Sequence, residues 1–266
     1  MTDKIVRSHS DAGKALLPKR FLTSLANVFA KEGYRIYQGR NEVRVVPVNE
    51  RKIVIKKYGK PPIFNRIFYS LGIRDPKSVR SYKNAQEILA RGFRTPQPLA
   101  QEIHYHNGLL GDSYFVSEWA EGRSLAAVRK TGTLVRSFAR YTAQLHEAGM
   151  MHRDYILSNV LFTMENNRYK FELIDINRFI FQKGPLDYFH VCVNLMQPFR
   201  EDRRIRVFVT TYARARQMNE KRLVWWVLRF RHLRNRYSQL KGILRKLPGA
   251  HYFTRKAESR RRRRRR

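Results

Sequence analysis

The stretch Met151-His-Arg-Asp-Tyr-Ile-Leu-Ser-Asn-Val-Leu-Phe162 is the part of the sequence that decides the fold. It contains a His-Arg-Asp triplet, then Asn159, and then an apolar run typical of a short strand. Transfer of a phosphoryl group needs a carboxylate that orients the attacking hydroxyl and an oxygen ligand that holds magnesium. Asp154 and Asn159 supply both from one loop. The stretch therefore favours phosphoryl transfer over the alternative in which His152 and Asp154 only cap neighbouring elements.

Asp175 is the candidate for a second metal ligand. It closes an apolar run at Leu173-Ile174 and follows Asp154 by 21 residues, a distance that suits a strand, a turn at Asn166-Asn167 and a return strand. That hairpin would bring Asp175 beside Asn159, and two hard oxygen ligands close together match magnesium. An aspartate at a strand end is also a common turn residue, but its spacing from the first motif favours the metal role.

Lys56 closes the apolar strand Ile53-Val-Ile-Lys56, where its side chain can point toward nucleotide phosphates. Lysines at strand ends are plentiful, so Lys56 taken alone is as easily a surface residue. A phosphate-binding lysine also needs an acidic partner, and Glu87 lies on a predicted helix 31 residues later. Lys57 would face the other way, because successive side chains on a strand alternate. We therefore expect Glu87 to hold Lys56 at the phosphates.

Taken together, these motifs resemble the protein-kinase-like fold, in which a strand lysine, a helix glutamate, a connector, the His-Arg-Asp loop and a metal aspartate follow in this order. The resemblance implies an α+β, two-lobed fold with a small β-rich N-lobe and a larger helical C-lobe. It makes Tyr114-Phe-Val-Ser-Glu-Trp-Ala-Glu-Gly122 the hinge, where backbone groups of Glu118 and Ala120 contact adenine. Gly39-Arg-Asn41 stands where a glycine-rich loop is expected, so Arg40 becomes a candidate phosphate contact. The expected activation segment and Ala-Pro-Glu are missing, which disfavours ordinary protein-substrate kinase activity.

A narrower resemblance is to the bacterial lipopolysaccharide core kinases, which include Kdo kinases and heptose kinases. It covers residues 33–200 and rests on Val54-Ile-Lys-Lys-Tyr-Gly-Lys-Pro61, Arg80-Ser-Tyr-Lys-Asn-Ala-Gln-Glu87, Thr95-Pro-Gln-Pro98, His152-Arg-Asp-Tyr155 and Asp175-Ile-Asn-Arg178. The resemblance implies phosphorylation of a sugar hydroxyl on lipid-linked core oligosaccharide, with ATP and Mg²⁺ as cofactors. It makes Asp154 the base and Asn159 and Asp175 the Mg²⁺ ligands. Lys56 with Glu87 would position the phosphates.

Two other functions stay open at this point. A protein kinase that phosphorylates Ser, Thr or Tyr would also carry an intact His-Arg-Asp. The second alternative is a non-catalytic basic binding protein on a kinase scaffold. A pure binder has no need of all four candidate side chains, which are Lys56, Asp154, Asn159 and Asp175.

The composition describes a folded and very basic protein. The 266 residues carry 55 Lys and Arg against 21 Asp and Glu, a formal net charge of +34, and 42% of them are hydrophobic, too many for a disordered chain. Such a charge argues for an anionic partner, and an anionic membrane surface agrees with the resemblance. Nucleic acid is supported by charge alone, because the sequence shows no RNA- or DNA-binding motif.

Cysteine content and hydropathy exclude several classes of protein. Cys192 is the single cysteine, which excludes an intrachain disulfide scaffold and a cysteine-based zinc cluster. Residues 1–17 show no apolar region of a signal peptide, and no apolar run approaches the ~20 residues that span a bilayer. With the resemblance, these features predict a cytoplasmic protein that is peripheral on the inner face of the inner membrane.

The order of predicted elements divides the chain into five parts. These are an irregular leader over 1–20, a kinase-like N-lobe over 21–118, a hinge over 119–123, a helical C-lobe over 124–250 and a disordered basic tail over 251–266. Strands are predicted over 34–37, 42–46, 52–56, 99–105, 113–118, 160–162 and 171–174, and helices over 78–91, 134–148 and most of 185–247. The arginines from Arg260 to Arg266 repel one another and fit either a solvated tail or a tether to phosphates.

The last predicted helix carries apolar residues at helical spacing among basic ones. The apolar positions are Leu223, Trp226, Val227, Phe230, Leu233, Tyr237, Leu240 and Leu244. This stripe fits a helix packed in the core of the C-lobe, whereas Trp225-Trp226 beside arginines also fits the headgroup layer of a membrane. Both interpretations stay open, since one face of a helix can pack while the other meets lipid.

Overall fold

The structure is a computed structural model that describes residues 3–244. The chain divides into two compact units, Met1–Leu186 and Asp187–Arg266. This division differs from the predicted boundary at 119–123, because segments beyond the predicted hinge bond back to the first part of the chain. The Leu173 N–H donates to the Arg94 carbonyl at 3.0 Å, and Thr95 Oγ1 donates to the Leu173 carbonyl at 2.7 Å.

The first unit opens with an ordered strand and three short helices, so the prediction of an irregular leader over 1–20 is wrong. The elements are β1 (Lys4–His9), α1 (Asp11–Leu16), α2 (Lys19–Thr23) and α3 (Leu25–Lys31). β1 pairs antiparallel with residues 100–105, and Ser10 caps α1 by accepting a hydrogen bond from the Gly13 N–H at 2.9 Å. β1 is a half-exposed edge strand whose partner lies far along the chain, and such a strand has a weak local pattern.

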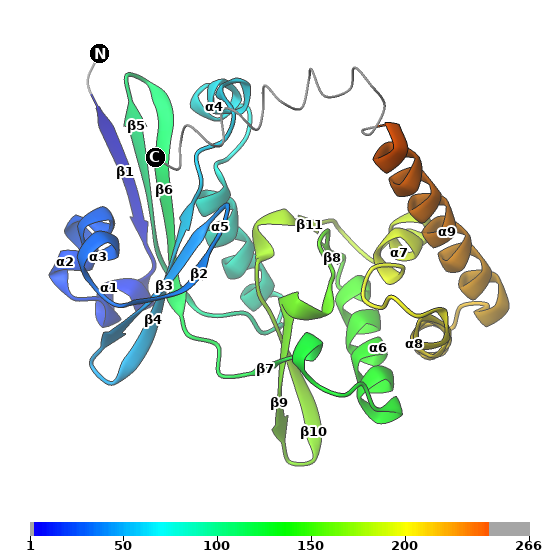
Figure 1. Cartoon of the computed structure of the whole chain (residues 1–266). Helices are drawn as coiled ribbons and strands as arrows, with labels where there is room; N and C mark the ends of the chain where they lie inside the picture. The colour runs from blue at the N-terminus through cyan, green and yellow to red at the C-terminus, as the bar shows by residue number, and fades with distance from the viewer. Residues whose placement is uncertain (1–2, 245–266) are drawn as a thin grey trace. The chain divides into compact units, whose positions relative to one another are not determined.

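The centre of the first unit is a six-stranded antiparallel sheet, seen in Figure 1. Its other strands are β2 (Tyr34–Gln38), β3 (Glu42–Val48), β4 (Arg51–Tyr58), β5 (Pro98–His106) and β6 (Leu109–Glu118). Their order across the sheet is β1-β5-β6-β4-β3-β2. The helices α4 (Ile63–Ser70) and α5 (Lys77–Ala90) lie between β4 and β5 in sequence. These bounds confirm the predicted strands and the predicted helix over 78–91, which is α5.

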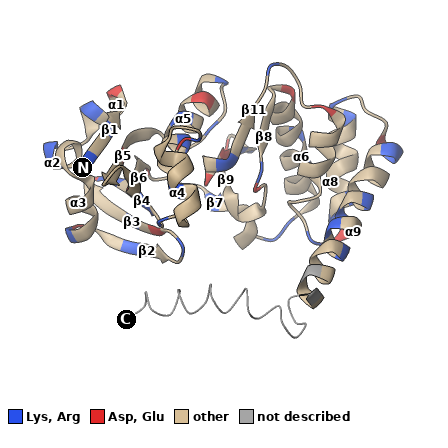
Figure 2. Cartoon of the chain, turned by 90° about the horizontal axis from the view of Figure 1, so that it is seen from above, with Lys and Arg blue, Asp and Glu red and all other residues tan. Residues whose placement is uncertain are grey.

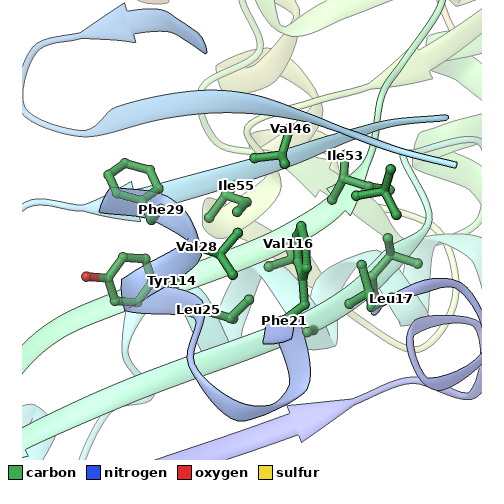
Figure 3. Close-up of a cluster of buried hydrophobic side chains, with 13 residues drawn as sticks. Leu17, Phe21, Leu25, Val28, Phe29, Val46, Ile53, Ile55, Tyr114 and Val116 are labelled. Atoms are coloured by element: carbon green, nitrogen blue, oxygen red, sulfur yellow. The ribbon is translucent and has the colours of Figure 1, made fainter. Parts of the chain in front are cut away.

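One face of this sheet packs against α1, α2 and α3 and closes the hydrophobic core drawn in Figure 3. Phe21, Leu25 and Val28 from the helices meet Ile53 and Ile55 of β4, and all five side chains are buried. Full burial of one such side chain contributes about 2 kcal/mol. Because side chains alternate along a strand, this packing turns the even-numbered residues of β4 toward the opposite face, where the site lies.

The remainder of the first unit carries the loops of the site. Its elements are β7 (Arg123–Ser124), the 3-10 helix η1 (Leu125–Ala127), α6 (Gly132–Glu147), β8 (Met150–His152), η2 (Leu157–Asn159), β9 (Val160–Glu165), β10 (Arg168–Leu173), η3 (Ile176–Arg178) and β11 (Phe179–Phe181). β9 and β10 form the predicted hairpin, with Val160 opposite Leu173. The φ angles of Asn166 and Asn167 are 48° and 58°, as a two-residue hairpin turn requires. β8 pairs with β11 in a further small sheet.

The second unit is helical within its described residues, and the chain as a whole is of the predicted α+β class. Its helices are α7 (Tyr188–Leu195), α8 (Asp202–Ala215) and α9 (Glu220–Leu244). Leu223 and Val227 in the first half of α9 are fully buried, whereas Leu233, Tyr237 and Leu240 are largely exposed. Core packing is thus confirmed for the first half of α9 alone.

Basic residues are spread over both units, as Figure 2 shows. Between residues 3 and 244, no helix combines the length and the apolar character needed to cross a bilayer. The predicted disordered tail over 251–266 lies outside the described residues.

Candidate active site

A cavity of about 420 Å³ opens beside the β4 face that is opposite the hydrophobic core. The predicted site residues that line it are Lys56, Glu118, Ala120 and Asp175. Most of its other lining residues are apolar, among them Val43, Val54, Phe115, Trp119, Leu161 and Ile176. A mainly apolar cavity with a few convergent polar groups is typical of a small-molecule site. The predicted site residues outside this lining are Arg40, Glu87, Asp154 and Asn159.

His152 ties the His-Arg-Asp loop to the segment that carries Asp175. Its ring is buried, Nδ1 accepts a hydrogen bond from the Asp154 N–H at 3.2 Å, and Nε2 lies 3.1 Å from the Ile174 carbonyl. With Nδ1 as an acceptor, the single proton is on Nε2, which donates to Ile174. Burial lowers the pKa of His152 although that bond opposes the change, so the ring is neutral at pH 7. His152 therefore positions the two aspartates.

Asp154 presents its carboxylate at the end of this loop, where Arg178 binds it. Arg178 Nη1 donates to both carboxylate oxygens, at 2.9 and 2.8 Å. The side chains are 41% exposed for Asp154 and 56% for Arg178, so the carboxylate is open to a substrate hydroxyl. Arg178 comes from η3, directly after Asp175, and this single turn therefore carries one aspartate and binds the other. Residues 24 positions apart make this contact, and no local sequence signal could have found it.

Asn159 and Asp175 supply the oxygen atoms predicted for magnesium. Asn159 Nδ2 donates to the Asp154 carbonyl at 2.9 Å, so Oδ1 is the atom of the amide that could bind a metal. The Ile174 N–H donates to the Asn159 carbonyl at 3.0 Å, and this bond ties the residue before Asp175 to the loop. One amide oxygen and one carboxylate fit Mg²⁺, which binds few protein ligands and completes its octahedron with phosphate and water oxygens.

Lys56 and Asp175 form an ion pair at the cavity. Lys56 Nζ donates to Asp175 Oδ1 at 2.6 Å, and the Asn177 amide also donates to that oxygen, at 2.7 Å. Burial by itself would raise the pKa of Asp175, but the charge and hydrogen bond of Lys56 outweigh it and hold this pKa below its usual value. Burial likewise opposes the charge of Lys56, yet Tyr58 and Asp175 raise its pKa overall. Both partners are therefore charged at neutral pH.

Asp175 also has a backbone conformation that few residues adopt. Its φ is 54° and its ψ is 45°, in the left-handed region. Aspartate and asparagine tolerate this region better than other residues with a Cβ, but it is still strained. Strain of this kind persists where the surroundings determine the conformation, and it is concentrated at functional sites.

Glu87 does not hold Lys56 as predicted. Its Oε1 accepts a hydrogen bond from Arg91 Nε at 2.7 Å, one helical turn later on α5. Asn84 of α5 instead contacts the turn after Asp175, where its Nδ2 donates to the Ile176 carbonyl at 2.7 Å. In the sequence, Glu87 is the favoured acidic partner of Lys56. In the structure, Asp175 supplies the negative charge that pairs with Lys56. A neutral amide on α5 is sufficient to hold the turn after Asp175.

Arg40 lies in the turn that stands in place of a glycine-rich loop. Gly59 permits this turn to approach β4, since a Cβ on Gly59 would lie 2.0 Å from the Arg40 carbonyl oxygen. Arg40, Arg80 and Arg178 all repel the ammonium group of Lys77 at the start of α5. We name these four side chains the cation cluster. Such a cluster suits phosphate oxygens, and Arg40 is its one member among the predicted site residues.

Lys77 is expected to make binding of a nucleotide pH-dependent above neutrality. Burial, and then repulsion within the cation cluster, lowers the pKa of Lys77 to about 8. The charge is present below this pKa and is lost above it, so the charged fraction falls about tenfold between pH 7 and pH 9. We expect the Kd for ATP, measured by titration calorimetry, to rise over this interval. In Lys77→Arg the Kd should stay nearly constant, because a guanidinium keeps its charge. Identical pH profiles of the two proteins would contradict this role.

Glu118 and Ala120 lie at the predicted hinge, and both line the cavity. The Glu118 N–H donates to the Gln97 carbonyl and the Trp119 N–H to the Lys52 carbonyl, each at 3.0 Å. The Glu118 carboxylate accepts a hydrogen bond from Arg51 at 3.0 Å, and the Glu118 carbonyl accepts one from Ser117 Oγ at 3.1 Å. Contact of these backbone groups with adenine stays a prediction.

A family model matches a segment that contains every predicted site residue. It is the model of the lipopolysaccharide kinase (Kdo/WaaP) family, and it matches residues 31–182. No protein of curated function matches the sequence significantly.

Solved structures share the fold. The structure described as WaaP in complex with acyl carrier protein aligns with a TM-score of 0.57 and 16% identity, over 85% of this chain and 98% of that chain. A microcompartment-associated aminopropanol kinase aligns with a TM-score of 0.51 and 11% identity, over 77% of this chain and 85% of that chain. These likenesses confirm the predicted kinase-like fold, with an N-terminal antiparallel sheet and a helical C-terminal part.

Proposed function

The chain belongs to the lipopolysaccharide kinase (Kdo/WaaP) family, and on that premise we propose that it transfers the γ-phosphoryl group of ATP to a hydroxyl of a Kdo or heptose residue in lipid-linked core oligosaccharide. Membership makes the chain an ATP-dependent kinase; the sugar and its lipid-linked form are the proposal. The observation that carries it is the set of contacts that links Asp154 and Asn159 to the segment of Asp175, which lines the cavity together with Lys56.

The chemistry that this site would perform is mainly positioning and neutralisation of charge. Asp154 would accept the proton of the attacking sugar hydroxyl, and Arg178 orients its carboxylate until that hydroxyl arrives. Lys56, which lines the cavity, would bind phosphate oxygens. Asn159 and Asp175 would hold Mg²⁺, which when bound offsets the negative charge of the phosphates.

The two alternatives have less support than a sugar kinase. The chain passes from Asp175 through η3 and β11 directly to α7, which leaves a short segment where a protein kinase has its activation segment. A non-catalytic binder would not need an aspartate that is open to solvent and oriented by an arginine. The retained contacts of Asp154 and Lys56 support a catalytic role.

The proposed partners are the lipid-linked acceptor and the anionic membrane surface that presents it. ATP and this acceptor meet at the cytoplasmic face of the inner membrane, so we place the enzyme there as a peripheral protein. A formal net charge of +34 supports an anionic surface as partner. Charge is the single argument for nucleic acid, which we therefore do not propose.

Mass spectrometry of lipopolysaccharide from cells with and without the gene tests the proposal. We expect the core to lose one phosphate group when the gene is deleted, and the position of that group identifies the sugar. Incubation of the purified enzyme with labelled ATP, separately with a lipid-linked core precursor and with protein, is the matching test in vitro. An unchanged core together with label on protein would establish the protein kinase instead. Failure to bind Mg²⁺·ATP would favour the non-catalytic binder.

A further inference from the structure

Helix α4 is amphipathic, but most of its apolar side chains face solvent; the buried Tyr69 packs with Ile103 and Leu110, and Arg66 and Ser70 bond to β6. Arg66 Nε donates to the Leu110 carbonyl at 2.6 Å, and the Leu110 N–H donates to Ser70 Oγ at 2.9 Å. These two bonds attach α4 to β6, beside which it lies in Figure 1. They also set the rotation of the helix. A surface helix ordinarily has the opposite orientation, with its apolar stripe against the core.

The solvent side of α4 and the turn after it carry a continuous apolar stripe. Its members and their exposed fractions are Ile63 48%, Phe64 75%, Ile67 40%, Phe68 49%, Leu71 69% and Ile73 65%. We call these six residues the α4 stripe. Positions 64, 67, 68 and 71 share one helical face. Single exposed apolar side chains are common, but a contiguous group of this kind marks an interaction surface.

Basic residues flank the α4 stripe on both sides. From Lys57 to Lys83, with both ends included, the sequence has seven Lys and Arg and a single acidic residue, Asp75. Lys60 precedes the stripe and is 51% exposed, with its nearest carboxylate 3.8 Å away. Arg74 follows the stripe and is also exposed. An apolar centre with a cationic rim complements an anionic lipid surface, because headgroups attract the rim and the acyl boundary receives the centre.

We propose that the α4 stripe docks on an anionic bilayer, with Phe64, Phe68 and Leu71 entering the boundary between headgroups and acyl chains. The stripe is followed at once by α5, whose Lys77 and Arg80 belong to the cation cluster. Docking would therefore bring this end of the active site to the lipid surface. The purpose of such docking rests on the proposed function, in which the acceptor is lipid-linked. The docking itself is a lipid-binding event that can be measured without phosphoryl transfer.

Sedimentation of the full-length protein with phosphatidylcholine vesicles, with and without phosphatidylglycerol, tests the docking. We expect the wild type to bind the anionic vesicles. The partition coefficient of Phe64→Ser/Phe68→Ser should be lower than that of the wild type by about tenfold or more, since two apolar side chains leave the lipid. The melting temperature should not change, because both side chains are exposed in the protein. Leu233→Ser/Leu240→Ser is the matched control, with two exposed apolar side chains on α9. It should keep its partition coefficient to within about twofold.

A fluorescent dye at position 64 reports directly whether the α4 stripe inserts into the bilayer. It therefore distinguishes insertion from adsorption of the protein by charge alone. Cys192 is buried, so an environment-sensitive thiol dye labels Phe64→Cys selectively. We expect its emission to rise severalfold with anionic vesicles, whereas Met164→Cys, at an exposed position on β9, should not respond. Equal partitioning of wild type and Phe64→Ser/Phe68→Ser, loss of binding in the α9 variant alone, or a silent dye at position 64 would each overturn the proposal. Phosphorylation of a delipidated core oligosaccharide by Phe64→Ser/Phe68→Ser tests the proposed function separately.

Discussion

Asp154→Asn is expected to lower kcat for sugar phosphorylation by about a thousandfold, with little change in the KM for ATP. The amide keeps the shape of the side chain and can still accept a hydrogen bond from Arg178. It cannot take the proton of the attacking hydroxyl. Asp154 lies outside the lining of the cavity, so nucleotide binding should persist. Steady-state kinetics with labelled ATP and calorimetric ATP binding measure the two parameters separately.

Glu165→Gln is the matched control for this variant. Glu165 also pairs with one arginine through two hydrogen bonds, from Arg94 at 2.6 and 3.1 Å, but it lies on the β9–β10 hairpin away from the aspartates. Exposed pairs of this kind stabilise the fold weakly, so both variants should melt close to the wild type. Loss of turnover in Asp154→Asn alone then reports the base. Wild-type turnover by folded Asp154→Asn would show that another group takes the proton.

The parts of the site that the sequence predicts correctly have local patterns. The apolar alternation along β4 locates the strand and gives the side on which Lys56 lies. The return of the chain to Asp175 follows from two strands and a turn, and Asn166-Asn167 is a strong turn signal. Asp154 and Asn159 are close because four residues separate them. Short-range constraints of this kind leave little freedom to the backbone.

The parts that the sequence does not predict depend on partners far along the chain. The choice of Asn84 over Glu87 depends on the rotation of α5 against η3, which a helical pattern alone does not set. The contact of Arg178 with Asp154 arises because the hairpin returns η3 to the loop. β1 forms because it pairs with β5 at the edge of the sheet. Each of these contacts is decided by tertiary packing, which outweighs local propensity.

The orientation of α4 illustrates the same limit with a consequence for function. A periodic apolar stripe indicates an amphipathic helix, and its usual interpretation is a face buried in the core. In α4 the hydrogen bonds of Arg66 and Ser70 with Leu110 turn that face outward. Hydropathy shows which residues share a side of a helix. Which side meets water depends on the contacts that anchor the helix.

Asp175→Asn is expected to weaken Mg²⁺ binding and to lower kcat by about a thousandfold. The carboxylate pairs with Lys56 and would also bind the cation, and a neutral amide would offer a negative charge to neither. Asparagine is the appropriate replacement because it tolerates the φ of 54° at this position, whereas alanine would add backbone strain. The initial rate as a function of Mg²⁺ concentration, with calorimetric binding of Mg²⁺·ATP, measures the effect.

Asp175→Asn should also change the pH dependence of stability. Lys56 holds the pKa of Asp175 below its usual value against the opposing effect of burial. The ion pair therefore stabilises the fold above the pKa of the unfolded chain, and this contribution is lost as the pH falls through the lower pKa of the folded state. Thermal unfolding over a range of acidic pH should show this acid-sensitive part in the wild type and not in Asp175→Asn.

Asp112→Asn is the matched control, because it breaks the ion pair of the neighbouring lysine on β4. Lys57 Nζ lies 2.9 Å from the Asp112 carboxylate and 5.5 Å from the centre of the Tyr114 ring, as expected for a side chain that faces away from Lys56. Asp112 also lies 3.8 Å from Lys60. Each variant removes the carboxylate that pairs with a lysine of β4, so a shared loss of stability reflects the loss of an ion pair. Loss of Mg²⁺-dependent transfer in Asp175→Asn alone reflects the site. An equal Mg²⁺ response of both variants would mean that Asp175 holds Lys56 without holding the metal.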